Sequence, residues 1–357
     1  MNWTQILKTN NMNNKLIIKS NNKVFWELDK KNNLFDLSSF PKNNKFRIIN
    51  FNLLATAVSN FKTYDHKKES GKMIELRYNN IAKILLYFMH TNIDIINLQE
   101  LDGSMYLLLN GLIKLYNLPY KLFFNNYFIK KKKLNFRGYD VGIIVNIKKY
   151  KILKCILKNI TPQKILNENS LYTTKRSKKA FFCEIQNKIN NKKIAIISTH
   201  LSGQPQRPDI RIEELNTIIK FIKNNLNVNF TFITGDFNDQ NYESINKIVL
   251  AGNLSIYKKY VNNLFTATSF HKINLIRETQ KFEIFDDIDI FQTIDYLVSN
   301  INEKKINHIM MPHPINGIYG YENPYNDIIK INDHNYLENK NVWPSDHALI
   351  EFIINLN

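Results

Sequence analysis

The feature that most constrains the fold is an apolar run that ends abruptly in oxygen-bearing side chains. Residues 230–234 are apolar or β-branched, as in a buried strand, and the run stops at Gly235. Asp236, Asn238 and Asp239 follow at once. Because residues two apart lie on the same side of an extended chain, Asp236 and Asn238 can address one point in space, as ligands of a hard cation such as Mg²⁺ do. Gly, Asp and Asn are also ordinary turn residues, so this stretch alone leaves a simple loop open as the alternative.

The rest of the chain mixes runs of apolar strands with interleaved amphipathic helices. Short apolar runs predict strands, and apolar residues at helical spacing predict helices. The expected strands lie at 46–52, 93–98, 137–146, 150–157, 180–185, 194–198, 230–234, 291–299 and 348–354, and the expected helices at 73–90, 105–115, 211–224 and 242–251. This order favours an α/β fold with two packed sheets flanked by helices over a doubly wound single sheet.

Composition predicts one large folded domain behind a polar extension. Of the 357 residues, 44% are hydrophobic, which is enough for a sizeable core. Residues 1–44 are rich in Asn and Lys, so we expect an N-terminal extension there and one catalytic domain at 45–357. The longest apolar run, 84–89, is too short to cross a bilayer, so no membrane insertion is expected. The N-terminus lacks a secretory pattern and the two cysteines, Cys155 and Cys183, fit no zinc or disulfide framework, which favours an intracellular location.

An excess of positive charge points to a polyanionic partner. Forty-nine Lys and Arg residues stand against 31 Asp and Glu residues, a formal net charge of +18, which favours nucleic acid above all. Basic residues cluster at 130–133 and 175–179. Because Lys, Asn and Ile are abundant throughout, solvated basic loops without a binding role are the alternative.

Several predicted strands end in polar groups of the same few kinds. These are Asn52, Glu100, His200, Asp236 with Asn238, Asp295, and Asp346 with His347. Each alone has an ordinary explanation as a cap, a turn residue or a buried histidine. Asp295 is expected inside an apolar strand, where an ionised carboxylate is costly unless it is paired. Attack on a phosphodiester builds negative charge that a metal ion and a cationic imidazole stabilise, so the set together predicts a metal-assisted phosphoester site.

The motifs also resemble, in order, those of the endonuclease/exonuclease/phosphatase superfamily. They are FNLLA at 51–55, INLQELD at 96–102, RGYDVGIIVN at 137–146, STHL at 198–201, TGDFND at 234–239, TIDYLVS at 293–299 and WPSDHALIEF at 343–352. The resemblance spans about residues 46–354. It implies a four-layer α/β/β/α sandwich, with two mixed β-sheets packed face to face and helices outside. It also implies a phosphoester hydrolase that depends on Mg²⁺, or on Mn²⁺ in its place.

The resemblance further implies the metal ligands. Glu100 would be the principal Mg²⁺ ligand, with Asn52 and Asp346 alongside. Asp236 would orient and deprotonate the attacking water, or hold a second metal ion together with Asn238.

The phosphate-contacting groups follow from the same resemblance. His347 would contact the scissile phosphate, with Asp295 fixing its ring, and His200 would be a second such histidine. The expected substrate-binding residues are Asn52, Asn238, Tyr139 and Arg211.

Motif details favour one branch of the superfamily. FNLLA and LQELD resemble the deadenylase and nocturnin branch, and Asp102 stands where apurinic-site nucleases usually carry lysine. RGYDVGIIVN, at 137–146, looks at least as much like the exonuclease III pattern, and no Arg-rich continuation typical of inositol phosphatases follows GDFND. The loop 301–342 carries aromatic residues that could stack on bases, although a structured surface loop is the alternative.

We therefore expect a monomeric, Mg²⁺-dependent 3′-exonuclease of deadenylase type, acting on single-stranded RNA without a leucine-rich or other recruitment domain. The alternatives are a DNA nuclease of exonuclease III type and a phosphatase or phospholipase for a small phosphorylated head group. An inactive fold that serves as a binding module is the alternative from outside catalysis.

Overall fold

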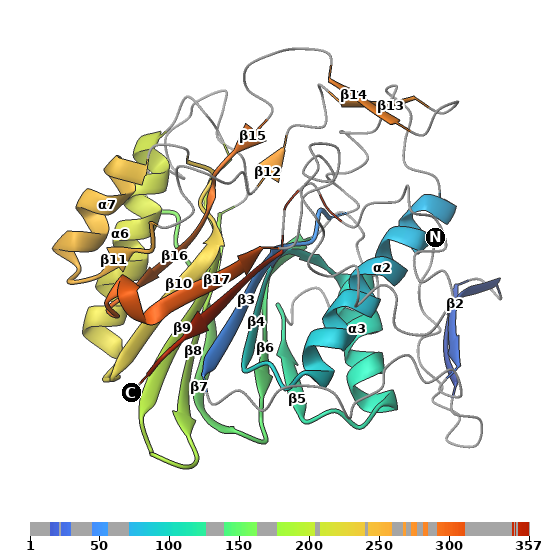
Figure 1. Cartoon of the computed structure of the whole chain (residues 1–357), viewed down its shortest axis with the longest axis horizontal. Coiled ribbons are helices and arrows are strands. Elements are labelled where there is room, and N and C mark those ends of the chain that lie inside the picture. The colour runs from blue at the N-terminus through green and yellow to red at the C-terminus, as the bar shows by residue number, and fades with distance from the viewer. Residues whose placement is uncertain are drawn as a thin grey trace.

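Two six-stranded sheets packed face to face form the centre of the computed structural model (Figure 1). The residues that the structure describes are 15–20, 23–29, 45–55, 71–125, 139–162, 177–203, 208–239, 242–258, 267–268, 273–276, 281–284, 291–310, 345, 347 and 349–356. The basic run at 130–133, Asp346, and most of the loop 301–342 lie outside this part.

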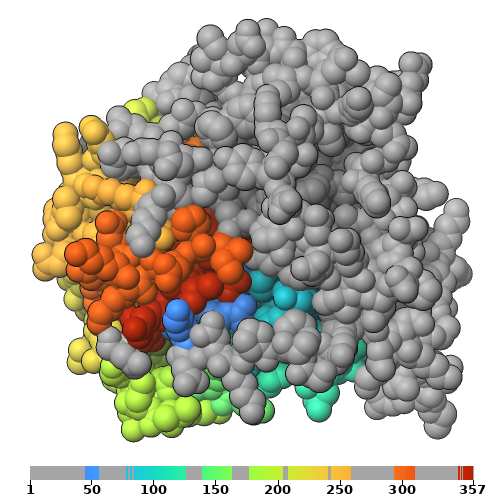
Figure 2. Space-filling view, viewed as in Figure 1, coloured from blue at the N-terminus to red at the C-terminus, as the bar shows by residue number. Residues whose placement is uncertain are grey.

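The first sheet contains the strands that carry the first two motifs. Its order is β17 (Ile306–Met310), β18 (Ile350–Ile354), β3 (Phe46–Asn52), β4 (Ile95–Asp102), β6 (Tyr139–Asn146) and β5 (Tyr120–Phe123). β3 and β4 are parallel, and the other neighbours are antiparallel. The space-filling view shows β3 and β18 side by side on the surface, so the first and last strands of the sandwich are neighbours (Figure 2).

The second sheet contains the strand that ends within the TGDFND motif. Its order is β11 (Ser255–Ile256), β16 (Asp295–Ser299), β10 (Phe230–Asp236), β9 (Lys193–His200), β8 (Lys179–Asn187) and β7 (Tyr150–Asn159). β9 and β10 are parallel, and the other neighbours are antiparallel.

Helices cover the outer face of each sheet (Figure 1). The first sheet packs on α2 (Gly71–His90) and α3 (Gly103–Leu115) through a buried apolar cluster, and the second packs on α6 (Pro208–Asn225) and α7 (Tyr242–Ala251). A third apolar cluster, which includes Ile48, Ile95, Phe232 and Leu297, fills the space between the sheets. The predicted four-layer α/β/β/α sandwich is therefore confirmed.

The two halves of the sandwich share one topology. In each, a helix joins two parallel strands, β3–α2–β4 and β9–α6–β10, and a second helix leads into an antiparallel pair. The carboxyl ends of parallel strands lie at the same edge of a sheet, and loops there commonly carry ligands and catalytic groups. Each half therefore brings two strand ends to one end of the sandwich.

The prediction of one strand at 291–299 is wrong in detail, because the structure has two shorter strands there. It is divided into β15 (Phe291–Gln292), which pairs with β12 (Ala267–Thr268), and β16, which begins at Asp295. Asp295 is thus the first residue of β16 and not a residue in the middle of a strand. It is buried, and it pairs with Asp236 at the end of β10.

Smaller elements complete the described chain. They are the hairpins β1 (Lys15–Ser20) with β2 (Lys23–Asp29) and β13 (Ile273–Ile276) with β14 (Lys281–Ile284), and a short 3₁₀-helix at Glu303–Lys305. The boundary between an extension at 1–44 and a domain at 45–357 stays a prediction. Within the described residues, no helix combines the length and apolar character needed to cross a membrane.

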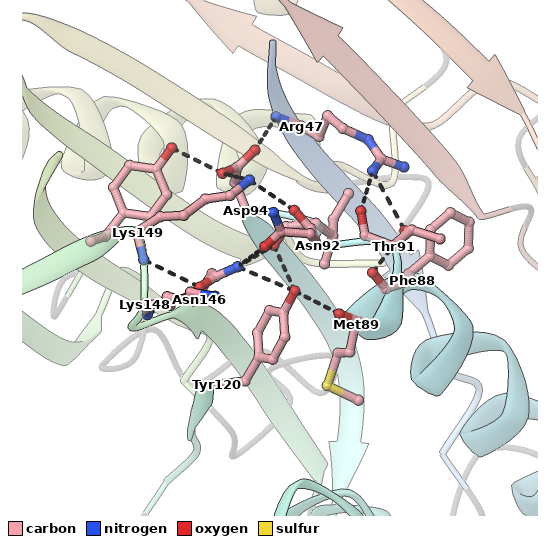
Figure 3. A network of polar contacts seen from close by, with 12 residues as sticks. Arg47, Phe88, Met89, Thr91, Asn92, Asp94, Tyr120, Asn146, Lys148 and Lys149 are labelled. Carbon is pink, nitrogen blue, oxygen red and sulfur yellow. Dashed lines mark hydrogen bonds and ion pairs between the residues drawn. The ribbon is translucent and has the colours of Figure 1, made fainter. Parts of the chain in front are cut away.

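A polar network closes the end of the first sheet at which β3 begins (Figure 3). The buried Asp94 carboxylate accepts hydrogen bonds from the Arg47 backbone N–H at 2.8 Å, Lys149 Nζ at 2.9 Å and the Tyr150 hydroxyl at 3.0 Å. Arg47 also donates to Glu351 Oε1 at 2.5 Å. Buried carboxylates are tolerated when they are paired and hydrogen-bonded, so this network stabilises the fold.

We expect Lys149→Met to lower the free energy of unfolding by about 1–2 kcal/mol, because it leaves the buried Asp94 carboxylate without its charged donor. Lys148→Met is the matched control, since the adjacent Lys148 is exposed and only its backbone N–H bonds to Asn146. Urea denaturation of both variants measures the difference. Equal stabilities of the two variants would contradict the assigned role of Lys149.

Candidate active site

One carboxylate oxygen lies at the meeting point of the predicted site residues. Asp236, at the end of β10, places Oδ2 3.1 Å from Asn52 Nδ2, which donates a hydrogen bond to it. His200 Nε2 lies 3.5 Å from this oxygen and His347 Nε2 lies 3.6 Å from it. The other oxygen, Oδ1, accepts the backbone N–H of Asn238 at 2.8 Å. Side chains from both sheets therefore converge on Asp236.

His347 is held by a carboxylate on the opposite sheet. Its Nδ1 donates to Asp295 Oδ2 at 2.8 Å, and its Nε2 lies 3.3 Å from Asn52 Nδ2. Asn50, two residues before Asn52, donates to the second oxygen of Asp295 at 3.2 Å. An imidazole fixed through Nδ1 presents Nε2 in a defined direction, here toward Asp236.

Ser345 joins the segment before β18 to the end of β3. The Ser345 hydroxyl donates to the Asn52 backbone carbonyl at 2.5 Å and accepts the His347 backbone N–H at 3.1 Å. The Ser345 side chain thereby fixes the position of His347. Sequence reasoning assigned no role to Asn50 or Ser345, although both stand two residues from predicted site residues.

Glu100 has an unusual backbone conformation. Its φ is 55°, in the left-handed region that residues other than glycine rarely adopt, and it lies in a break of the β4–β6 register between Leu98 and Leu101. Its Oε2 accepts the Ala55 backbone N–H at 2.8 Å, so the carboxylate is bound to the loop after β3. Strained backbone of this kind concentrates at functional sites.

Gly235 permits the close approach of β9 and β10 beside the site. A Cβ atom at this position would lie 2.0 Å from the Thr199 backbone oxygen, a contact that no side chain allows. Thr199 and Gly235 are register partners, and the next pair is His200 with Asp236. The glycine therefore lets the two site residues emerge side by side.

Clustered negative charge makes this region suited to a cation. Burial raises the pKa of the Asp236 carboxyl to about 7, the nearby Asp295 and Glu100 carboxylates add to the rise, and His347 opposes it. A bound divalent cation would offset the repulsion among these carboxylates, and the oxygen donors suit Mg²⁺ or Mn²⁺. Among the described residues no three His, Cys, Asp or Glu side chains form a ready-made metal cage.

Asn52 and Asn238 are oriented by hydrogen bonds of their own. Asn52 Oδ1 accepts the Leu54 backbone N–H at 3.2 Å while its Nδ2 faces Asp236, so a bond to a metal ion would use the remaining capacity of Oδ1. Asn238, with a φ of 52°, donates through Nδ2 to the Leu201 backbone oxygen at 3.0 Å. Both stay predicted metal and substrate ligands. Asp346, which lies outside the described residues, stays a predicted metal ligand.

The other two predicted substrate contacts, Tyr139 and Arg211, lie in different surroundings. Tyr139 is half-buried at the start of β6, opposite Asp102 in the register. Arg211 is only 5% exposed, and its Nε donates to Asp239 Oδ2 at 3.1 Å. This ion pair fixes the loop that follows Asp236, and substrate binding by Arg211 stays a prediction.

We expect Arg211→Met to lower the free energy of unfolding by about 2–4 kcal/mol, because it leaves the Asp239 carboxylate buried without its cation. Adding Asp239→Leu to this variant should restore part of the lost stability, since the unpaired charge is then removed. Lys220→Met, at an exposed position of the same helix, is the control and should change stability by under about 0.5 kcal/mol. A double variant less stable than Arg211→Met would contradict the ion-pair role.

Comparisons with known proteins agree with this geometry at the level of structure. No protein-family model matches the sequence, and no curated protein matches it. An endonuclease/exonuclease/phosphatase from Bacteroides vulgatus superposes with a TM-score of 0.57 at 14% identity, over 88% of this chain and 100% of that one. TDP2 of D. rerio, in a complex with a single-strand DNA product, superposes with a TM-score of 0.54 at 14% identity, over 88% of this chain and 100% of that one.

The catalytic domain of human nocturnin, with a bound sulfate anion, is a third similar structure. Its TM-score is 0.52 at 16% identity, over 87% of this chain and 94% of that one. At such identities the likeness establishes the fold. The chain therefore has the fold of the endonuclease/exonuclease/phosphatase proteins, which confirms the resemblance seen in the sequence motifs.

Proposed function

We propose that this chain is a divalent-metal-dependent phosphodiesterase that hydrolyses nucleic acid, in the form of an RNA 3′-exonuclease of deadenylase type. The observation that carries the proposal is the convergence of Asn52, His200 and His347 on Asp236, from both sheets of this fold, with Asp295 holding the His347 ring. The arrangement combines a fixed carboxylate with two imidazoles, which can serve as a base for water and as donors to the negative charge that develops on a phosphate.

The metal ion would be held by Glu100, with Asn52 and Asp346 as further ligands. Once bound, Mg²⁺ or Mn²⁺ supplies positive charge that stabilises the phosphate oxygens and the leaving group. All other steps fall to side chains of this chain.

Asp236 is placed to hold and deprotonate the attacking water. Its Oδ1 is fixed by the Asn238 N–H, and its Oδ2 faces Asn52 and both histidines, so the carboxylate has a set direction. A water within hydrogen-bond reach of a fixed carboxylate meets the geometric requirement for general base catalysis.

His347 and His200 are placed to contact the phosphate. Asp295 accepts the hydrogen bond of His347 Nδ1 and so holds the ring, and Nε2 can then donate to a phosphate oxygen as charge develops there. His200 approaches the same carboxylate from the end of β9, the strand beside β10 in the second sheet.

Two observations favour nucleic acid as the substrate. The net charge of +18 suits a polyanion, and the FNLLA and LQELD motifs resemble the deadenylase and nocturnin branch. Single-stranded RNA is the substrate that this combination favours. An intracellular location and a monomeric state remain further parts of the proposal.

Single-stranded DNA is the second candidate substrate. The observation that favours it is the similarity to TDP2 of D. rerio, which was determined with a single-strand DNA product. The RGYDVGIIVN stretch, with its resemblance to the exonuclease III pattern, points the same way.

The function is tested with one panel of substrates at equal enzyme concentration. The panel contains 5′-labelled poly(A) RNA, single-stranded DNA of matching length, duplex DNA with an abasic site, sphingomyelin and an inositol polyphosphate. With Mg²⁺ or Mn²⁺ we expect shortening of the RNA in single-nucleotide steps from its 3′ end. We expect EDTA to abolish this activity and added metal to restore it, because the carboxylates of the site need a cation to accept an anionic substrate.

Each other outcome selects a different function. Turnover of DNA alone would favour the second candidate, and turnover of the lipid or inositol substrate alone would contradict action on nucleic acid. Unchanged activity in EDTA would contradict metal dependence. Tight RNA binding without any turnover would favour an inactive binding module.

We expect His347→Gln to lower kcat/KM on the active substrate by about 10²–10³-fold, because the amide cannot supply the positive charge of an imidazolium. His308→Gln is the matched control and should leave kcat/KM unchanged, since His308 lies on β17 and pairs with the Tyr257 hydroxyl. Circular dichroism checks that both variants fold. Equal activity of the two variants would remove His347 from the mechanism.

A further inference from the structure

The only two cysteines of the chain face each other across two strands. Cys155 lies on β7 and Cys183 on β8, and they are direct register partners in the antiparallel pair. Their thiols are close enough to share a hydrogen bond. Antiparallel partners have Cα atoms about 4.5 or 5.5 Å apart, and both values lie within the range that disulfides span.

The two thiols differ in their access to solvent. Cys183 is fully buried in the apolar cluster between the sheets, whereas Cys155 is half-buried on β7. β7 is the terminal strand of its sheet and pairs there with β8 alone. A small movement of β7 toward β8 therefore breaks no pairing with another strand of that sheet. The hydrogen bond with Cys155, and then burial, raise the pKa of the Cys183 thiol well above its usual range, while Lys121 opposes this. A dissolved reagent therefore reaches Cys155 first.

We propose that Cys155 and Cys183 form a redox-modification site that closes to an intramolecular disulfide in the presence of a low-molecular-weight disulfide such as oxidised glutathione. The Cys155 thiolate attacks one sulfur of the reagent, which forms a mixed disulfide and releases one glutathione thiolate. Cys183 then loses its proton and attacks the Cys155 sulfur, which releases the second glutathione. Two protein thiols are oxidised and one reagent disulfide is reduced to two thiols.

The crosslink would constrain a segment that borders the candidate active site. It closes residues 155–183, and just beyond Cys155 the chain reaches Thr161, whose hydroxyl donates to Glu214 at 2.8 Å and accepts the Lys178 backbone N–H. On β8, Ala180 pairs with Thr199, the neighbour of His200. A disulfide that closes such a loop restricts the unfolded chain, so the oxidised form should be more stable than the reduced form.

The test uses the full-length protein, reduced, desalted and equilibrated with glutathione buffers of increasing oxidised fraction. We expect the thiols titrated after denaturation to fall from two to zero per chain. The intact mass should fall by two hydrogen atoms without a glutathione adduct, and the melting temperature should rise by a few degrees. These readouts need no substrate, so their result is independent of the proposed function.

Two alanine variants separate the roles of the thiols. Cys183→Ala should accumulate a stable glutathione adduct on Cys155, because the second step is lost. Cys155→Ala should resist modification, because the remaining thiol is buried. Neither variant should gain stability on oxidation.

The proposal is overturned if wild-type protein keeps both thiols in the most oxidising buffer. It is equally overturned if wild-type protein retains a glutathione adduct as Cys183→Ala does, or if oxidation yields only dimers linked between chains on a non-reducing gel.

Discussion

A small set of hydrogen bonds between the two sheets sets how the sheets are placed against each other. Asn97 on β4 donates to the Thr234 hydroxyl on β10 at 2.7 Å and to the Ile197 carbonyl on β9 at 3.3 Å. In the other direction the Ser198 hydroxyl on β9 donates to the Leu98 carbonyl at 3.2 Å. Apolar burial between the sheets is non-directional and so permits many positions of one sheet relative to the other. A buried polar group, in contrast, destabilises every position in which it has no hydrogen-bond partner. These bonds therefore fix the relative position that brings Asn52 and His347 to Asp236.

The two halves of the sandwich place a carboxylate at the candidate site by different backbone features. β4 and β10 occupy equivalent places, and each carries a site carboxylate: Glu100 lies two residues before the end of β4, and Asp236 is the last residue of β10. On β10 the neighbouring glycine allows the close approach to β9, since a Cβ atom there would meet the Thr199 oxygen. On β4 the register breaks and Glu100 itself takes a positive φ, with the Ala55 N–H bound to its carboxylate. The first feature is visible in the sequence as a glycine, and the second is not, because nothing about a glutamate signals a left-handed backbone.

The same distinction explains what the sequence could predict. Apolar runs followed by polar residues located β3, β4, β9 and β10 and most residues of the candidate site, because burial and strand ends leave a local pattern. The start of β16 at Asp295 was missed, since TIDYLVS continues an apolar run through it and the break depends on pairing with other strands. Asn50 and the Cys155–Cys183 pair were also missed. Their contacts depend on strand register, which for Cys155 includes an irregularity between Ile152 and Lys154 that spacing alone does not reveal.

A buried carboxylate lies at each end of the sandwich, and the two carboxylates differ in the partners that surround them. Asp94 is surrounded by donors from the protein itself, including Lys149, with which it forms an ion pair, so its negative charge is compensated within the fold. In the part of the chain that the structure describes, Asp236 is paired with His200 and His347, whose charge depends on protonation, and it lies near Glu100 and Asp295. Charge that is neutralised internally contributes to stability, whereas charge left for an incoming cation contributes to binding. Because one fold holds both arrangements, the difference between them distinguishes its supporting end from the end that holds the candidate active site.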